Sequence, residues 1–138
     1  MLKIAGLALV ALAAPIGSGA QTPAAPSAAT PPSGEMVYAD NCAACHQPKG
    51  EGIAGPFPAL AGNALVTGPA DTLATTVLVG RGGMPAFKNE ISDDDMAAML
   101  TFIRGAWGNQ AAPISSADVA AARAKAAADP RQSGLQAH

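Results

Sequence analysis

The chain of 138 residues has few aromatic side chains, few cysteines and no excess of basic charge. Eight Lys and Arg residues stand against ten Asp and Glu, so the formal net charge is −2 and no nucleic-acid partner is expected. Alanine supplies the largest share of the hydrophobic residues, and such small side chains fill a core poorly. The aromatic residues are Tyr38, Phe57, Phe87, Phe102 and Trp107.

No hydrophobic run is long enough to form a membrane-spanning helix. The longest has about eleven residues before Pro15 ends it, against the roughly 20 that a span needs. Because Lys3 precedes this run and small residues follow it, residues 1–20 are predicted to be a secretory signal peptide, cleaved after Ala20. An uncleaved N-terminal anchor is the alternative. Cleavage would place the mature protein in the periplasm without a stable membrane span.

Composition divides the remaining chain into three parts. Residues 21–33 are rich in proline and alanine and are predicted to form an extended, flexible leader. Residues 34–109 are predicted to be the ordered domain, and the alanine-rich residues 110–138 a C-terminal extension. Neither a strand pattern nor an internal repeat occurs, so the predicted fold class is all-α.

The first two predicted helices are separated by a long loop. A helix is expected over 35–45, where neither proline nor glycine occurs. The next begins near Pro69, which suits a first helical position, and stops at Gly80. The intervening residues 46–68 are dense in glycine and proline, which indicates a loop, and residues 81–90 form a second loop.

The clearest predicted helix begins after Ser92, which forms a capping box with Asp95. Its apolar residues keep a spacing of three to four as far as Trp107. Gly105 or Gly108 is expected to end it. A last helix is predicted over 117–128. Val119 is its only large apolar residue, so weak docking at best is expected.

Both cysteines lie in one motif, Cys42-Ala43-Ala44-Cys45-His46. In an exported protein, Cys-x-x-Cys-His is typical of c-type haem attachment. Thiols three residues apart on a helical turn can each form a thioether to a vinyl group of one macrocycle, and the next residue then lies beneath the iron. The predicted cofactor is therefore one haem c, covalently bound through Cys42 and Cys45, with His46 as the proximal iron ligand. A buried porphyrin also supplies the apolar bulk that the aromatic residues do not.

Three other sites use paired cysteines. A thioredoxin-like redox pair needs a βαβ setting, and the sequence shows no strands. A structural zinc needs four ligands, but outside the motif the only further Cys or His is His138. A simple disulfide would leave His46 and the glycine-rich loop unexplained. The motif therefore favours haem.

The sixth iron ligand is predicted to be a methionine. Met96 and Met99 lie on the apolar face of a predicted helix and are expected in the core. Met36 lies on the helix that already carries the cysteines. Met84 follows two glycines and precedes Pro85 in a loop, where the backbone can approach a flat cofactor closely. Met84 is therefore the predicted axial ligand.

Ligation by His46 and Met84 fills both axial positions and leaves no open position for oxygen or substrate. The thioether also raises the reduction potential, so the predicted function is one-electron transfer rather than catalysis. A haem-based sensor, or an enzyme with peroxidase activity, would need Met84 to detach. Binding of carbon monoxide to the reduced protein would distinguish both from a carrier.

The motifs together resemble the class I monohaem c-type cytochromes over residues 34–109. The resemblance implies a small cytochrome c fold with three to four helices around one haem. Gly34 and Tyr38 precede Cys42 at this family's four-residue steps, where the small residue lets the first and last helices cross closely.

Further site residues follow from the same resemblance. It implies that the carbonyl of Pro58 accepts a hydrogen bond from Nδ1–H of His46. Pro56 is the alternative acceptor if the loop is bulged. It also implies that Leu60 packs on the haem. Arg81, in the loop that carries Met84, is a candidate to pair with a haem propionate, and a solvated charge is its alternative.

A closer resemblance concerns the partners. Residues 57–63, residues 84–87 and the Trp107-Gly108-Asn109 segment are similar to cytochrome domains of periplasmic dehydrogenases, of the alcohol dehydrogenase type. This implies redox protein partners, with a dehydrogenase as electron donor and an oxidase or another cytochrome as acceptor. A non-catalytic subunit of a larger dehydrogenase, with the helix at 117–128 as its docking element, is the alternative.

Overall fold

The computed structural model describes residues 32–129, so the predicted signal peptide and nearly all of the leader lie outside the described residues. Within that range the chain forms six helices and no named strand, apart from two isolated β-bridges. The predicted all-α class is confirmed. No helix among residues 32–129 has the length and hydrophobicity that a membrane crossing needs.

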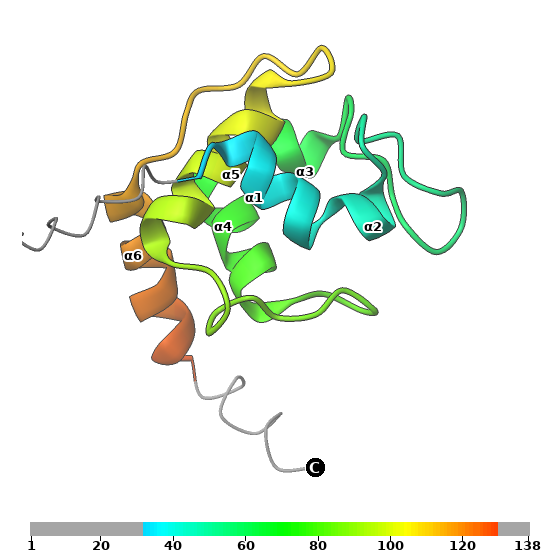
Figure 1. Cartoon of the computed structure of the whole chain (residues 1–138). Coiled ribbons are helices and arrows are strands. Elements are labelled where there is room, and N and C mark those ends of the chain that lie inside the picture. The colour runs from blue at the N-terminus through cyan, green and yellow to red at the C-terminus, as the bar shows by residue number, and fades with distance from the viewer. Residues whose placement is uncertain (1–31, 130–138) are drawn as a thin grey trace, which may run out of the picture.

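The helices occur in two groups along the chain. Four precede the second long loop: α1 (Gly34–Asn41), α2 (Ala43–His46), α3 (Ala64–Thr67) and α4 (Ala70–Val79). Two follow it: α5 (Asp93–Gly105) and α6 (Ser116–Ala127). Figure 1 shows α1 lying across α5, α6 beside α4, and α2 at the opposite end of the molecule from α6.

The crossing of α1 and α5 depends on Gly34. A Cβ atom at this position would lie 2.1 Å from the carbonyl oxygen of Ala98, a distance that no side chain tolerates. Val37 and Tyr38 on α1 are buried at the crossing, as are Met99 and its neighbours on α5. The close crossing that the sequence predicts at Gly34 is confirmed.

Cys42 divides the first predicted helix into α1 and α2. Its φ of −121° departs from helical geometry, and α2 then continues to His46, where Gln47 ends it with a φ of 65°. The prediction of one continuous helix over 35–45 is therefore wrong at Cys42. The break turns the second part of the motif away from the axis of α1.

The loop predicted over 46–68 contains the short helix α3. The side chain of Asn63 caps it by accepting a hydrogen bond from the backbone N–H of Leu65 at 2.9 Å. Val66 is buried, whereas the rest of the turn is more open. Four residues give too short a pattern for a helical period to be recognised in the sequence.

Helix α5 begins after the N-cap residue Ser92 and ends at Gly105. Ser92 accepts a hydrogen bond from the backbone N–H of Asp95, which satisfies a free donor of the first turn. The helix stops at Gly105, the first of its two predicted ends, so Trp107 lies beyond it and does not continue its apolar face. Trp107 instead adopts a φ of 54° and packs its ring beside those of Tyr38 and Phe102.

Helix α6 packs more firmly than its composition indicates. Ser115 and Asp118 form a complete capping box at its start. Val119 and Ala122 are buried against α4 and α5, and Arg123 pairs with Asp93 at 2.8 Å. The expectation of weak docking is therefore wrong: alanine side chains allow a close approach, and Arg123, Lys125 and Ser116 add polar contacts to α4, α5 and the loop between them.

Candidate cofactor site

The Cys-x-x-Cys-His motif forms one helical turn. Backbone N–H groups of Cys45 and His46 both donate to the carbonyl oxygen of Cys42, at 3.1 and 2.9 Å. The two cysteines and His46 are each partly buried, and both thiols are free. The turn therefore presents two thiols and an imidazole from one rigid segment.

Cys42 is the inner of the two thiols. Its Sγ lies 3.5 Å from Sδ of Met99 on α5. Burial, and secondarily the neighbouring Cys45, raises the pKa of the Cys42 thiol to about 11. In the absence of a thioether bond this thiol therefore stays protonated at neutral pH.

The geometry of His46 determines its tautomer. Its Nδ1 lies 2.9 Å from the carbonyl oxygen of Pro58. Since a carbonyl oxygen only accepts hydrogen bonds, Nδ1 carries the hydrogen and donates it. The lone pair is then on Nε2, the nitrogen that is left to bind a metal. Pro58, rather than the alternative Pro56, is the acceptor.

Backbone hydrogen bonds fix the loop that contains Pro58. Ile53 and Phe57 form an isolated bridge, with N–O distances of 2.7 and 3.0 Å. Gly52 precedes the bridge with a φ of 65°, and a Cβ atom there would lie 2.5 Å from the carbonyl oxygen of Phe57. The N–H of Leu60 donates a hydrogen bond to the carbonyl oxygen of Gly50 at 2.7 Å. The acceptor for His46 is thus part of a closed turn.

An aromatic cluster supports the start of this loop. The hydroxyl of Tyr38 donates to the carbonyl of Gln47 at 2.5 Å. Burial, followed by the nearby charges of Cys42 and Glu51, raises the pKa of Tyr38 to about 12. The ring of Trp107 lies where a Cβ atom on Gly50 would be, within 2.4 Å.

Asn109 is a site residue for which sequence reasoning assigned no role. It is 4% exposed, and its Oδ1 accepts a hydrogen bond from the backbone N–H of Gly62, with an N–O distance of 2.8 Å. Its Nδ2 donates to the carbonyls of Leu60 at 3.1 Å and Ile103 at 2.7 Å. Asn109 thereby joins the loop to the end of α5. The only signal in the sequence is its place in the Trp-Gly-Asn segment.

The second predicted ligand, Met84, lies in a tight turn after α4. Arg81 and Met84 exchange two backbone hydrogen bonds, at 3.2 and 3.0 Å. Gly80 starts this turn with a φ of 76°, and a Cβ atom there would lie 2.5 Å from the carbonyl oxygen of Met84. The Met84 side chain is partly buried against the core, whereas Arg81 is exposed.

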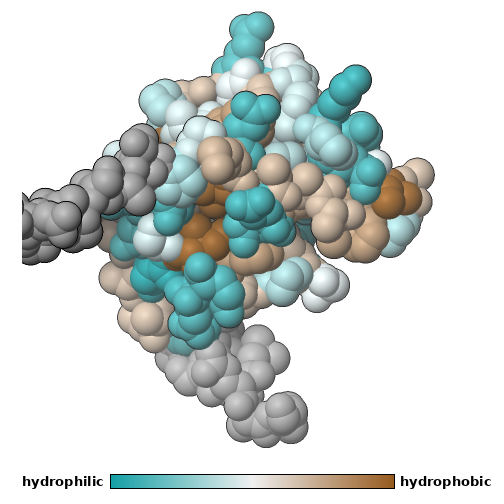
Figure 2. All heavy atoms as spheres, viewed as in Figure 1, coloured by the Kyte–Doolittle hydropathy of each residue, from teal (hydrophilic) through white to brown (hydrophobic). Residues whose placement is uncertain are grey.

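The structure brings three of the seven predicted residues to one core. Cys42, Leu60 and Met84 are partly buried and pack against it from three separate segments. Arg81 takes part in no salt bridge within residues 32–129, so its pairing with a propionate stays a prediction. Figure 2 shows hydrophobic atoms in a hollow near α4, with hydrophilic residues around them. Other partly buried apolar side chains that pack against the core are Ala43, Leu65, Ala70, Val79, Phe87, Phe102 and Trp107.

These residues fit a covalently bound haem better than a bare metal ion. Two free thiols, an imidazole with an available nitrogen and a partly buried thioether form the donor set. Across residues 32–129, no group of three or more His, Cys, Asp or Glu side chains converges on a possible metal position.

Comparison with known proteins agrees with this chemistry. Residues 29–103 match the family described as cytochrome c oxidase, cbb3-type, subunit III. The chain belongs to this cytochrome c family. Its cofactor is accordingly haem c, with Cys42 and Cys45 as the thiols that bind it covalently, and its function is electron transfer. The predicted resemblance to c-type cytochromes is confirmed.

Relatives of the cytochrome include subunits of larger enzymes. It is 39% identical over 99 residues to the cytochrome c subunit of alcohol dehydrogenase (quinone) from Gluconobacter oxydans (strain 621H), which covers 62% of this chain and 21% of that protein. It is 35% identical over 104 residues to the gluconate 2-dehydrogenase cytochrome c subunit of Pantoea cypripedii, which covers 65% and 24%. The chain thus spans about a fifth to a quarter of the length of these two proteins.

A smaller relative matches over most of its length. The cytochrome is 38% identical over 73 residues to cytochrome c6 of Leptolyngbya boryana, and the match covers 51% of this chain and 85% of that protein. The similarity therefore extends to a small cytochrome as well as to parts of dehydrogenase subunits.

Proposed function

We propose that this cytochrome is a one-electron carrier whose haem iron is bound by His46 and Met84. The observation that carries the proposal is the 2.9 Å hydrogen bond from Nδ1 of His46 to Pro58, which leaves Nε2 as the ligand atom. A haem c bound here supplies reversible one-electron chemistry at its iron. The role of the protein is to keep both ligands in place while the charge of the iron changes.

On the His46 side, Pro58 is a positioning residue. Its carbonyl orients the imidazole and increases the electron density on Nε2, which strengthens the ligand. Leu60, partly buried beside the same core, is proposed to pack on the ring and exclude water. Exclusion of water lowers the reorganisation energy of the solvent when the charge of the haem iron changes.

On the Met84 side, the bridged turn limits movement of the ligand. The two backbone hydrogen bonds between Arg81 and Met84 fix the start of the side chain. A thioether ligand raises the reduction potential. Arg81 is proposed to pair with a propionate, and because it is exposed the pair contributes little to stability.

The proposed role is not enzymatic, because both axial positions would be filled. The proposed site of action is the periplasm, after cleavage of the signal peptide predicted at residues 1–20. The proposed electron donor is a dehydrogenase, and the acceptor an oxidase or another cytochrome. The two dehydrogenase cytochrome subunits among the relatives support this choice of donor. A permanent place in such an enzyme complex is the alternative.

Absorption spectroscopy of the holoprotein tests the ligands. The oxidised wild type is expected to show the weak sulfur-to-iron band, and Met84→Ala is expected to lose it while keeping the c-type haem spectrum. The reduced wild type is expected to bind carbon monoxide poorly and the variant readily. A band that survives the substitution would exclude Met84, and ready binding by the wild type would favour the sensor.

A further inference from the structure

The loop that carries Met84 has two ends that are held differently. It connects α4 to α5, and its first part contains the Arg81–Met84 bridge. In its middle, the N–H of Phe87 donates to the carbonyl of Val77 on α4 at 3.1 Å. After Phe87 the backbone hydrogen bonds of the loop, from Glu90 and Ile91 to Phe87, are internal to it. The end of the loop is therefore held by the buried side chain of Ile91 and by polar contacts from another element.

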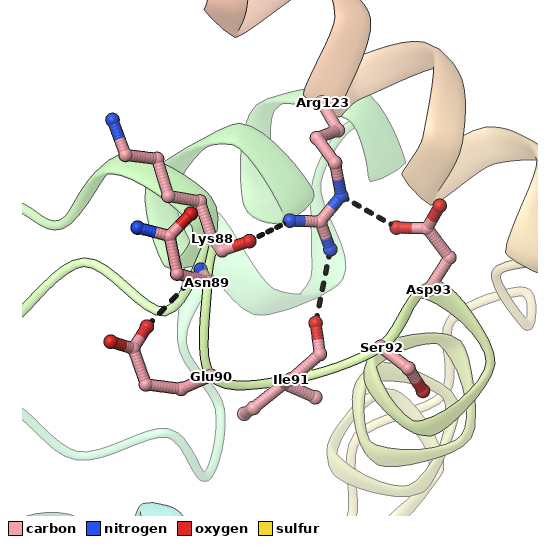
Figure 3. Close-up of a pocket in the computed structure, with 7 residues that line it drawn as sticks. All are labelled: Lys88, Asn89, Glu90, Ile91, Ser92, Asp93 and Arg123. Atoms are coloured by element: carbon pink, nitrogen blue, oxygen red, sulfur yellow. Dashed lines mark hydrogen bonds and ion pairs between the residues drawn. The ribbon is translucent and has the colours of Figure 1, made fainter.

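These polar contacts come from Arg123 of α6. Its Nε donates to the Asp93 carboxylate at 2.8 Å, its Nη2 to the carbonyl of Ile91 at 3.1 Å, and its Nη1 to the carbonyl of Lys88. Figure 3 shows the guanidinium between these three acceptors. A planar guanidinium has donors on three nitrogens, whereas a lysine ammonium in the same place is a single point of charge.

From this geometry we infer that Arg123 is a positioning residue for Met84. It keeps the end of the loop, from Lys88 to Ile91, against the start of α5 and so restrains release of the thioether. Pro85, directly after Met84, fixes φ in the short segment that joins the ligand to the residues that Arg123 binds. The inference rests on the proposed ligation by Met84.

The position of α6 makes this restraint independent of the haem-binding segments. Val119 and Ala122 are buried against α4 and α5, which fixes the helix on which Arg123 stands. The side chain of Arg123 is 28% exposed and that of Asp93 33% exposed, so water screens the contact only in part. Helix α6 thus acts on the iron site through the loop.

Lys125 provides a matched control on the same helix. It forms an ion pair with Asp71 at 3.7 Å, and both side chains are largely exposed, at 76% and 63%. Replacing Lys125 by alanine removes the same charge from the same element as replacing Arg123. It leaves the loop untouched, so only a specific role of Arg123 separates the two variants.

The experiment measures how fast imidazole displaces Met84 in the oxidised holoprotein. At saturating imidazole the observed rate reports release of the methionine. For Arg123→Ala we expect a rise of about tenfold or more, because loss of one charge-assisted hydrogen bond corresponds to at least that factor in a local equilibrium. For Lys125→Ala we expect a change of less than about twofold, as for exposed ion pairs generally.

A denaturant titration separates positioning from general stability. In Arg123→Ala, the sulfur-to-iron band should disappear at a lower denaturant concentration than the far-ultraviolet helix signal, with a wider separation than in the wild type. If the two transitions shift together, Arg123 is merely structural. An unchanged imidazole rate, or an equal rise in Lys125→Ala, would also overturn the inference.

Two further variants keep the test decisive. If Arg123→Ala does not assemble with haem, Arg123→Lys retains the charge but not the three-acceptor geometry, and an intermediate rate is expected. A rate equal to that of the wild type in Arg123→Lys would count against positioning. Met84→Ala tests the ligand itself: if its band and imidazole kinetics equal those of the wild type, the proposed ligation fails, whatever Arg123 does.

Discussion

The two loops beside the site differ in what fixes them. The loop on the His46 side, residues 47–63, is supported by side chains that surround it within the haem domain: Tyr38, Trp107 and the buried Asn109. The loop on the Met84 side, from Gly80 to Ser92, is fixed by a short bridge at one end and by Arg123 of α6 at the other. The difference indicates that the second loop opens more easily.

This asymmetry suits an electron carrier with the two unlike ligands that we propose. His46 is covalently part of the segment that bears both cysteines, so its side of the site has little freedom. Met84 has no such attachment, and its place depends on the Arg81–Met84 bridge and on hydrogen bonds made by Arg123. Variants on the His46 side should therefore unfold the domain, whereas variants on the Met84 side should open the site locally.

The largest expected effect is that of Asn109→Ala. It removes one buried hydrogen bond, to the carbonyl of Ile103, and two partly buried ones, from Gly62 N–H and to the carbonyl of Leu60. The Leu60 carbonyl still accepts from the N–H of Asn63, so two groups lose their partner. A loss of about 2–6 kcal/mol in the free energy of unfolding is expected, since unsatisfied groups cost about 1–3 kcal/mol each. Chemical denaturation followed by circular dichroism measures it. A loss below about 1 kcal/mol would contradict the internal support that the comparison assigns to this loop.

Gly80→Ala should open the Met84 side selectively. The added Cβ meets the carbonyl oxygen of Met84, and φ is 76°, so the turn is strained by about 1–3 kcal/mol. The sulfur-to-iron band should weaken while the helix signal persists. Gly82→Ala is the control, because its φ is 58° but no atom lies within 4 Å of the new Cβ. Equal loss of the band in both would show that strain alone, not the contact with Met84, matters.

Tyr38 reports on the His46 side through its titration. Because Tyr38 is the chain's one tyrosine, its ultraviolet absorbance gives an unambiguous signal. Its pKa is raised from 10.0 to about 12. The folded state therefore binds this proton more tightly, and the resulting stabilisation is complete below pH 10 and is lost as the pH rises through about 12. In the holoprotein Cys42 is a thioether and carries no charge, so burial and then Glu51 are the causes that keep the pKa of Tyr38 raised. Ionisation at the ordinary value of 10.0 would contradict a closed loop.

Tyr38→Phe is a smaller test of the same loop. It removes the hydrogen bond to Gln47 and keeps the ring contacts with Phe102 and Trp107. A loss of about 1 kcal/mol is expected, the usual contribution of one such bond. Thermal unfolding of the two holoproteins in parallel gives the difference, and an unchanged or higher midpoint would show that Gln47 does not depend on this bond.

The smallest effect is expected for Asp71→Asn on α4. Its partner Lys125 is 3.7 Å away and both are exposed, so the free energy of unfolding should change by less than about 0.5 kcal/mol. The sulfur-to-iron band and its sensitivity to denaturant should stay as in the wild type. A marked change in either would mean that α6 depends on this pair, and that Arg123 is not its main polar contact.

The sequence predicted features that depend on residues close together in the chain better than features that join distant segments. The Cys42-x-x-Cys45-His46 motif lies within one turn of helix, and the helix start at Ser92 depends on residues three apart, so local patterns sufficed. The bond between His46 and Pro58 was predicted by resemblance and is present. The spacing of Trp107 fits the helix, so local patterns left its end open between Gly105 and Gly108, and the structure ends it at Gly105.

Residues that act over long separations were not recognised. Arg104 is 5% exposed and donates to the carbonyls of Val66, Gly68 and Ala112. Its partners are backbone oxygens, which every residue has, so no residue type marks them in the sequence. Arg123 and Asn109 escape prediction for the same reason. The firm packing of α6 was missed because alanine gives little hydrophobic signal but permits close contact.

By itself, the sequence determined the chemistry of this protein: two thiols, an imidazole and a thioether are properties of residue types and their order, and the motif needs only one turn of backbone. Tertiary structure alone decided which groups support these residues. The loops return to α5 and α6 only when the chain is folded, because the hydrogen bonds of Asn109, Arg104 and Arg123 join segments that are far apart in sequence. A backbone carbonyl becomes a specific acceptor for one of these side chains only when folding places the two groups next to each other.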